Sequence, residues 1–118
     1  HGIPGDVTST SRFVRAAFYV ATAPQRPTAF DTVLQCFHIL NNFDVPIAIE
    51  NPDEKSLPSA TQWTSAIDLS ARKIYYKTAY NNSIRVIDLH SIDFENVKYQ
   101  SHNLDTTKYQ PIENIAIK

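Results

Sequence analysis

The chain has 118 residues, of which 42% are hydrophobic and 19% charged, and its net charge is -1. This composition is typical of an ordinary globular domain. The near-neutral charge gives no electrostatic reason to expect nucleic acid or an anionic membrane surface as a partner, and no apolar run approaches the length of a membrane span. The single cysteine, Cys36, excludes an internal disulfide.

Two helices are predicted in the first 41 residues. Thr8 and the three residues after it are N-cap candidates, and the apolar residues that follow recur at helical spacing, so a helix is predicted over about 9–22. A second helix is predicted over about 28–41, closed by Asn41 and Asn42 because asparagine tolerates left-handed geometry. Its apolar residues form one predicted buried stripe. The stripe comprises Phe30, Val33, Leu34, Phe37 and Leu40.

An antiparallel meander is predicted after the helices. Strand candidates cover about 61–69, 73–80 and 83–89. Turns are expected at 70–72 and at Asn81-Asn82. The predicted fold class is therefore α+β, two helices followed by an antiparallel β meander.

The segments around the meander carry weaker patterns. The proline-rich stretch 43–60 is interpreted as a surface excursion, with a possible edge strand over 45–49. The strand over 83–89 has apolar residues on both faces, which predicts cover on both sides. Two helices cannot supply that cover, so we expect a larger body that this chain lacks. The polar residues 90–118 are expected to wrap the surface or pair at an edge.

Cys36 and His38 invite comparison with a cysteine–histidine nucleophilic pair. Residues two apart on a helix point to different sides, so the two side chains cannot readily hydrogen-bond. Cys36 is interpreted as a small buried hydrophobe and His38 as a structural histidine. The histidines show no spacing that suits a metal ion, and no metal or cofactor is expected. The four histidines are His1, His38, His90 and His102.

Glycine, proline and aromatic residues complete the candidate list. Gly5 after Pro4 indicates a turn in which glycine is free to take a positive φ, and Asp6 is expected to cap the first helix or to support this loop. Trp63 is interpreted as a sheet residue, with ligand stacking as the alternative. The same interpretation applies to Tyr75, Tyr76 and Tyr80.

Several sequence blocks, in order, resemble the choloylglycine hydrolase family. The first is Gly2-Ile3-Pro4-Gly5-Asp6, and it leads into Ser11-Arg12-Phe13-Val14-Arg15-Ala16-Ala17-Phe18. The later blocks are Phe37-His38-Ile39-Leu40, Thr61-Gln62-Trp63-Thr64, Asp68-Leu69, Tyr75-Tyr76, Tyr80-Asn81-Asn82, Ile84-Arg85 and Ile87-Asp88-Leu89, with Pro46 after the second helix. Together the blocks span residues 2–89.

This resemblance implies the αββα sandwich of N-terminal-nucleophile hydrolases, with residues 1–118 as an incomplete C-terminal segment of one domain. It implies hydrolysis of a linear amide C–N bond in a small molecule, such as a conjugated bile salt or penicillin V. The nucleophile of the family is an N-terminal cysteine, whereas position 1 here is His1. We therefore expect the missing N-terminal portion as a partner, a homo-oligomer, and no turnover by this chain alone. A bacterial cytoplasm and a periplasm both remain open.

Arg12 is the one family catalytic residue with a match in this chain. The resemblance implies that Arg12 lies beside the nucleophile, where a permanently charged guanidinium favours the thiolate and lowers the pKa of the thiol. A surface ion pair is the alternative role for Arg12, and Arg15 is interpreted as structural, with a carboxylate as its possible partner. Two other functions stay open: a non-catalytic module that binds itself or a partner, and a small hydrolase that uses Cys36.

Overall fold

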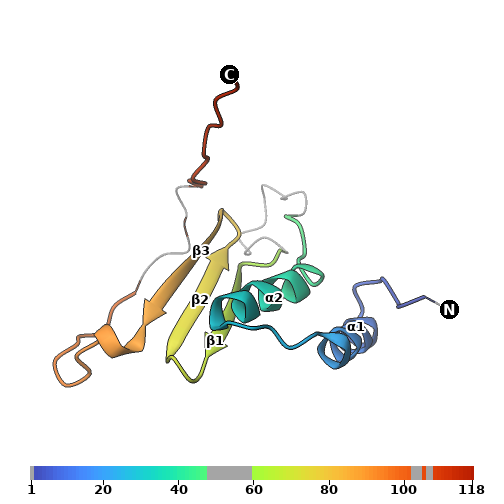
Figure 1. Cartoon of the computed structure of the whole chain (residues 1–118), viewed down its shortest axis with the longest axis horizontal. Coiled ribbons are helices and arrows are strands. Elements are labelled where there is room, and N and C mark those ends of the chain that lie inside the picture. The colour runs from blue at the N-terminus through green and yellow to red at the C-terminus, as the bar shows by residue number, and fades with distance from the viewer. Residues whose placement is uncertain (1, 48–59, 102–104, 106–107) are drawn as a thin grey trace, which may run out of the picture. The chain divides into compact units, whose positions relative to one another are not determined.

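The computed structural model describes residues 2–47, 60–101, 105 and 108–118. The chain divides into two compact units, residues 1–45 and 46–118. The first unit contains helices α1 and α2, and the second contains a three-stranded sheet (Figure 1). Among the described residues, neither helix is long and apolar enough to cross a membrane.

Helix α1 spans Ser9–Thr22, the range that the sequence predicts. Thr8 is its N-cap: the backbone is extended there, and the side-chain oxygen accepts a hydrogen bond from the backbone N–H of Ser11 at 3.3 Å. The helix ends at Ala23, whose extended backbone is what a following proline favours. The local sequence therefore sets both ends of α1.

Helix α2 spans Ala29–Asn41, again close to the prediction. Thr28 caps it by accepting a hydrogen bond from the backbone N–H of Asp31, at 3.1 Å. The predicted left-handed closure is wrong, because Asn42 has a right-handed backbone. Its side-chain amide instead donates to the carbonyls of His38 and Ile39, at 3.0 and 3.2 Å. Asparagine thus ends the helix through its side chain rather than through its backbone.

The second unit contains a sheet with strand order β1-β2-β3, and both strand pairs are antiparallel. Strand β1 spans Trp63–Asp68, β2 spans Lys73–Thr78 and β3 spans Asn81–Asp88, followed by the 3-10 turn Leu89–Ser91. The first turn lies where the sequence predicts it. Arg72 takes a positive φ of 53° there, and the backbone N–H of Ala71 donates to the Asp68 carboxylate at 2.9 Å.

The second turn differs from the prediction. The structure pairs Thr78 directly with Asn81, so Ala79 and Tyr80 form the turn and Asn81 opens β3. Neither turn residue needs a positive φ, so nothing in this turn requires asparagine. The Asn81 side chain instead accepts a hydrogen bond from the backbone N–H of Ser83, at 2.9 Å, at the start of the strand.

Two predictions concern the cover of β3 and the edges of the sheet. Ile84, Val86 and Ile87 are 40%, 52% and 42% exposed, so β3 is not covered on both faces. Residues 45–47 form no strand, and the rest of the predicted edge strand lies outside the described residues. The described part of 90–118 likewise adds no strand to the sheet. The sheet therefore has exposed apolar side chains on β1 and β3.

Candidate functional site

Arg12 is the fourth residue of α1, at the end of its first turn, and is half-buried. Its Nη1 donates a hydrogen bond to the backbone carbonyl of Phe43 at 3.1 Å, and its Cζ lies 5.4 Å from the centre of the Phe43 ring. Among the described residues, the guanidinium is thus held through Nη1, while Nε and Nη2 make no hydrogen bond.

Arg15, one turn along α1, faces the same ring. Its Cζ also lies 5.4 Å from the Phe43 ring centre, because residues three apart on a helix share one side. Arg15 is buried, and its Nη1 donates to the carbonyls of Pro4 and Asp6 at 2.9 and 2.8 Å. The structural role predicted for Arg15 is therefore found, with backbone carbonyls as hydrogen-bond partners rather than a carboxylate.

Asp6 supports the loop before α1 rather than capping the helix itself. Its carboxylate accepts hydrogen bonds from the hydroxyl and the backbone N–H of Thr8, and these bonds lower the pKa of Asp6. Thr8 is in turn the N-cap of α1. Gly5, in the same loop, does not use the positive φ open to glycine. Asp6, Thr8 and Arg15 thus fix the loop to the helix that carries Arg12.

The other candidate residues differ in how far they are exposed. Cys36 is half-buried rather than fully buried, and its thiol is free. His38 is exposed, and no hydrogen bond joins it to Cys36 within the described residues. Trp63 is 61% exposed, so it is not a core residue of this chain, whereas the three candidate tyrosines are half-buried.

Of the four histidines, His38 and His90 lie in the described residues, one in each unit. His90 is exposed in the 3-10 turn after β3, and His1 and His102 lie outside the described residues. No three His, Cys, Asp or Glu side chains in the described part of the chain are placed to hold a metal ion.

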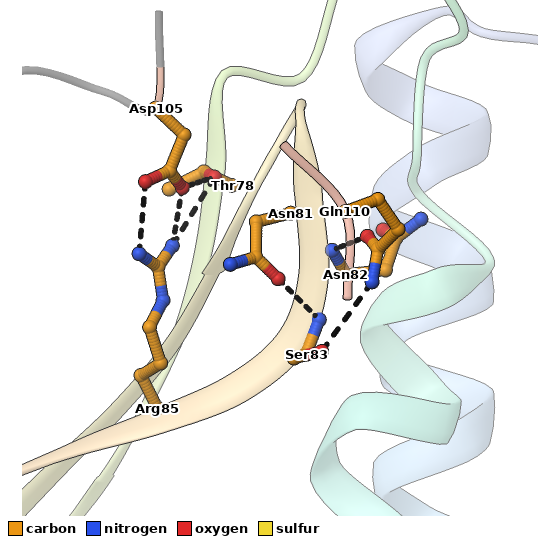
Figure 2. Close-up of polar contacts among 7 residues, drawn as sticks. All are labelled: Thr78, Asn81, Asn82, Ser83, Arg85, Asp105 and Gln110. Atoms are coloured by element: carbon orange, nitrogen blue, oxygen red, sulfur yellow. Dashed lines mark hydrogen bonds and ion pairs between the residues drawn. The ribbon is translucent and has the colours of Figure 1, made fainter. Parts of the chain in front are cut away.

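The second unit contains a polar cluster, centred on Arg85, that the sequence did not predict. Figure 2 shows the Asp105 carboxylate facing the Arg85 guanidinium, with Thr78 beside both. Arg85 binds the carboxylate with two nitrogens, and Thr78 donates to the same carboxylate. The Arg85 Cζ lies 4.7 Å from the ring centre of Tyr76, its direct partner on β2. The cluster attaches Asp105 to the sheet.

Gln110 makes a second attachment near the start of β3. Its side-chain oxygen accepts a hydrogen bond from the backbone N–H of Asn82, and its amide nitrogen donates to the Ser83 hydroxyl at 3.3 Å (Figure 2). Lys108, between the two attachments, lies with its Nζ 5.0 Å from the ring centre of Tyr80. These contacts hold Asp105, Lys108 and Gln110 against the sheet.

Acid is expected to release this segment. Hydrogen bonds from Arg85 and then Thr78 lower the pKa of Asp105 below its usual 3.8. Because the folded pKa lies below the unfolded one, the contribution of Asp105 is complete above the unfolded value and is lost as the pH falls through the folded value. We expect the amide of Asn82 to lose its protection from hydrogen exchange over that acidic range. Asp105→Asn should remove this pH dependence, and an unchanged acid midpoint in this variant would contradict the assignment.

Phe43 and the Arg85 cluster are the features that sequence reasoning missed. Phe43 follows a helix end and carries no periodic signal, and its contact with Arg12 spans 31 positions. Arg85 and Asp105 are 20 positions apart, and Asp105 lies in a segment without a pattern. The alternation of the strand assigned Arg85 to one face of the sheet, but no local sequence pattern identified Asp105 as its partner.

Comparison with known proteins relates this geometry to a family. The family model for linear amide C–N hydrolases of the choloylglycine hydrolase family matches residues 1–108. The bile salt hydrolase/transferase of Clostridium perfringens is 35% identical over 105 residues, which cover 86% of this chain and 31% of that protein. This chain thus spans about a third of the length of the curated relatives that it matches.

Solved structures show the same relationship. A cysteine-to-alanine mutant of the conjugated bile acid hydrolase from Clostridium perfringens has a TM-score of 0.68 and 28% identity, over 98% of this chain and 34% of that one. Penicillin V acylase from Agrobacterium tumefaciens has a TM-score of 0.64 and 27% identity, over 78% of this chain and 29% of that one. The predicted fold class is confirmed: the chain has the α+β fold of part of an N-terminal-nucleophile hydrolase, with two helices followed by an antiparallel meander. The chain belongs to the choloylglycine hydrolase family of linear amide C–N hydrolases.

Proposed function

We propose that this chain forms the C-terminal section of a cysteine-nucleophile hydrolase that cleaves linear amide C–N bonds in small molecules. The observation that carries the proposal is the family match over residues 1–108. The relatives' names indicate conjugated bile salts and penicillin V as the substrates to test first. In this proposal residues 1–118 belong to one incomplete domain, and the N-terminal portion of the same protein supplies the nucleophile.

Arg12 is the catalytic residue that this section contributes. A thiolate placed against the two guanidinium nitrogens that Phe43 leaves open would be stabilised relative to the thiol, which lowers the pKa of the nucleophile. The thiolate then attacks the amide carbonyl, the C–N bond breaks, and the amine leaves with the proton that the thiol gave up, so that a thioester remains. Water cleaves the thioester in a second step, which releases the acid and restores the thiol. Half-burial of Arg12 supports this role, because charge interactions are screened less there than at the open surface.

The direct test compares this chain with the intact protein that contains it. We expect the intact protein to hydrolyse a conjugated bile salt or penicillin V, and the chain alone to give no product above the buffer rate, because it lacks the nucleophile. Release of taurine, glycine or 6-aminopenicillanic acid is the measurement. Turnover by the chain alone would sink the proposal, and its loss in Cys36→Ser would assign that turnover to Cys36.

A second candidate function is a non-catalytic module that associates with itself. The exposed apolar side chains of the sheet favour it, since Trp63 and Ile67 on β1 are each 61% exposed. Ile67 is aligned through Ile74 with Ile87, so these residues share one face. An intact protein that sediments as an oligomer, lacks an N-terminal cysteine and cleaves none of the test amides would favour the module over the hydrolase.

A further inference from the structure

We infer that Phe43 is the positioning residue for Arg12 and thereby tunes the reactivity of the nucleophile, an inference that rests on the proposed function. Phe43 contacts the Arg12 guanidinium in two ways, with its backbone carbonyl at 3.1 Å and with its ring at 5.4 Å. A hydrogen bond fixes one nitrogen, and the ring face restricts the tilt of the guanidinium plane. Together they define the direction in which Nε and Nη2 point.

Arg12 and Arg15 share the Phe43 ring but have different roles. Arg12 and Arg15 lie at the same distance from the Phe43 ring. Two like charges one helical turn apart repel each other, and the negative face of an aromatic ring offsets part of that repulsion. Arg15 uses its Nη1 on the carbonyls of Pro4 and Asp6 and is buried. Arg12 has no such second anchor among the described residues, and within them Phe43 is the residue that orients its guanidinium.

The position of Phe43 in the chain supports this role. Phe43 comes two residues after the end of α2, and its own backbone N–H donates to the carbonyl of Leu40 at 2.9 Å. Asn42, the preceding residue, accepts a hydrogen bond from the Tyr19 hydroxyl of α1 at 3.3 Å. Phe43 is thus bonded to the last turn of α2, and the residue before it is bonded to α1, so these contacts fix the backbone that carries the ring.

The expected consequence is a change in nucleophile reactivity rather than in substrate affinity. In the intact protein, Phe43→Leu keeps the carbonyl contact and an apolar side chain but removes the ring. The Arg12 guanidinium then samples more orientations, and the thiolate loses part of its stabilisation. We expect the alkylation of the nucleophile by iodoacetamide to shift its midpoint to higher pH. We expect kcat to fall about threefold to tenfold with KM little changed.

Three variants separate positioning from a structural role. Phe43→Tyr retains the ring face and should keep the wild-type midpoint. Pentafluorophenylalanine at position 43 retains the shape but reverses the charge distribution of the ring, so it should shift the midpoint as Phe43→Leu does. Phe94→Leu is the matched control, since Phe94 is 68% exposed, and it should change nothing.

If Phe43→Leu fails to fold, the fluorinated protein still tests the inference, because pentafluorophenylalanine preserves the packing of the ring. A wild-type alkylation midpoint and kcat in both Phe43→Leu and the fluorinated protein would overturn the inference. If the intact wild type has neither turnover nor a titrating nucleophile, the proposed function fails instead. The contact of Phe43 with both arginines is then tested on this chain by NMR. Phe43→Leu should remove a ring-current shift from the side-chain protons of Arg12 and Arg15. Unchanged shifts would refute the contact.

Discussion

Arg12→Gln in the intact protein is expected to lower kcat/KM for the amide substrate about a hundredfold to a thousandfold, the usual cost of removing one preorganised charge-stabilising group. Glutamine retains donors of similar reach but carries no charge. The nucleophile should therefore lose stabilisation of its thiolate, and its pKa should rise. Steady-state kinetics and the pH dependence of thiol alkylation measure the two effects. Arg12→Lys keeps the positive charge but lacks the planar guanidinium. Its kcat/KM and its nucleophile pKa should lie between those of the wild type and Arg12→Gln.

Arg26→Gln is the matched control for Arg12→Gln. Arg26 lies in the exposed segment between α1 and α2, so the same loss of one positive charge occurs away from the Phe43 ring. We expect its activity to remain within about twofold of wild type, as for most surface substitutions. Equal losses in the two variants would mean that overall charge and not Arg12 matters. Arg12→Gln with wild-type kinetics would remove Arg12 from the catalytic site.

The helices and strands were predictable because their signals are local. Thr8 and Thr28 cap the helices next to the apolar periods that they precede, and both boundaries agree with the structure to within one residue. The prediction of a turn at Asn81-Asn82 was wrong because the position of this turn is not set locally. Its position depends on the register between β2 and β3, which pairs Thr78 with Asn81, and register is a property of two strands rather than of a dipeptide.

The candidate site was predictable only in part. Arg12 was identified through the blocks that resemble the family, while its contact with Phe43 connects the first helix to the residue beyond the second. The ion pair of Arg85 with Asp105 likewise joins a strand to a distant segment. Such contacts depend on how the backbone brings remote residues together, and no spacing within one element encodes them.

Phe37→Ala is expected to destabilise this chain by about 3–5 kcal/mol, the usual cost of emptying a buried aromatic position. Phe37 is 4% exposed, and with Val33 it makes up the buried apolar positions among the described residues. The loss is large against the about 5–15 kcal/mol that holds a typical domain together. Urea unfolding of the chain, followed by circular dichroism, measures it, and Phe37→Leu supplies a smaller step should the alanine variant be unfolded.

Phe30→Ala tests whether the loss of stability on truncating a phenylalanine of α2 depends on its burial rather than on the apolar pattern. The sequence pattern predicted that Phe30 and Phe37, two turns apart on α2, belong to one buried stripe. Phe30 is nevertheless 66% exposed. Phe30 is the second residue of α2 and lies in its first turn, close to the Thr28 cap. We therefore expect Phe30→Ala to change the free energy of unfolding by no more than about 0.5 kcal/mol. Equal losses at positions 30 and 37 would show that the predicted stripe, rather than the observed burial, describes the folded chain.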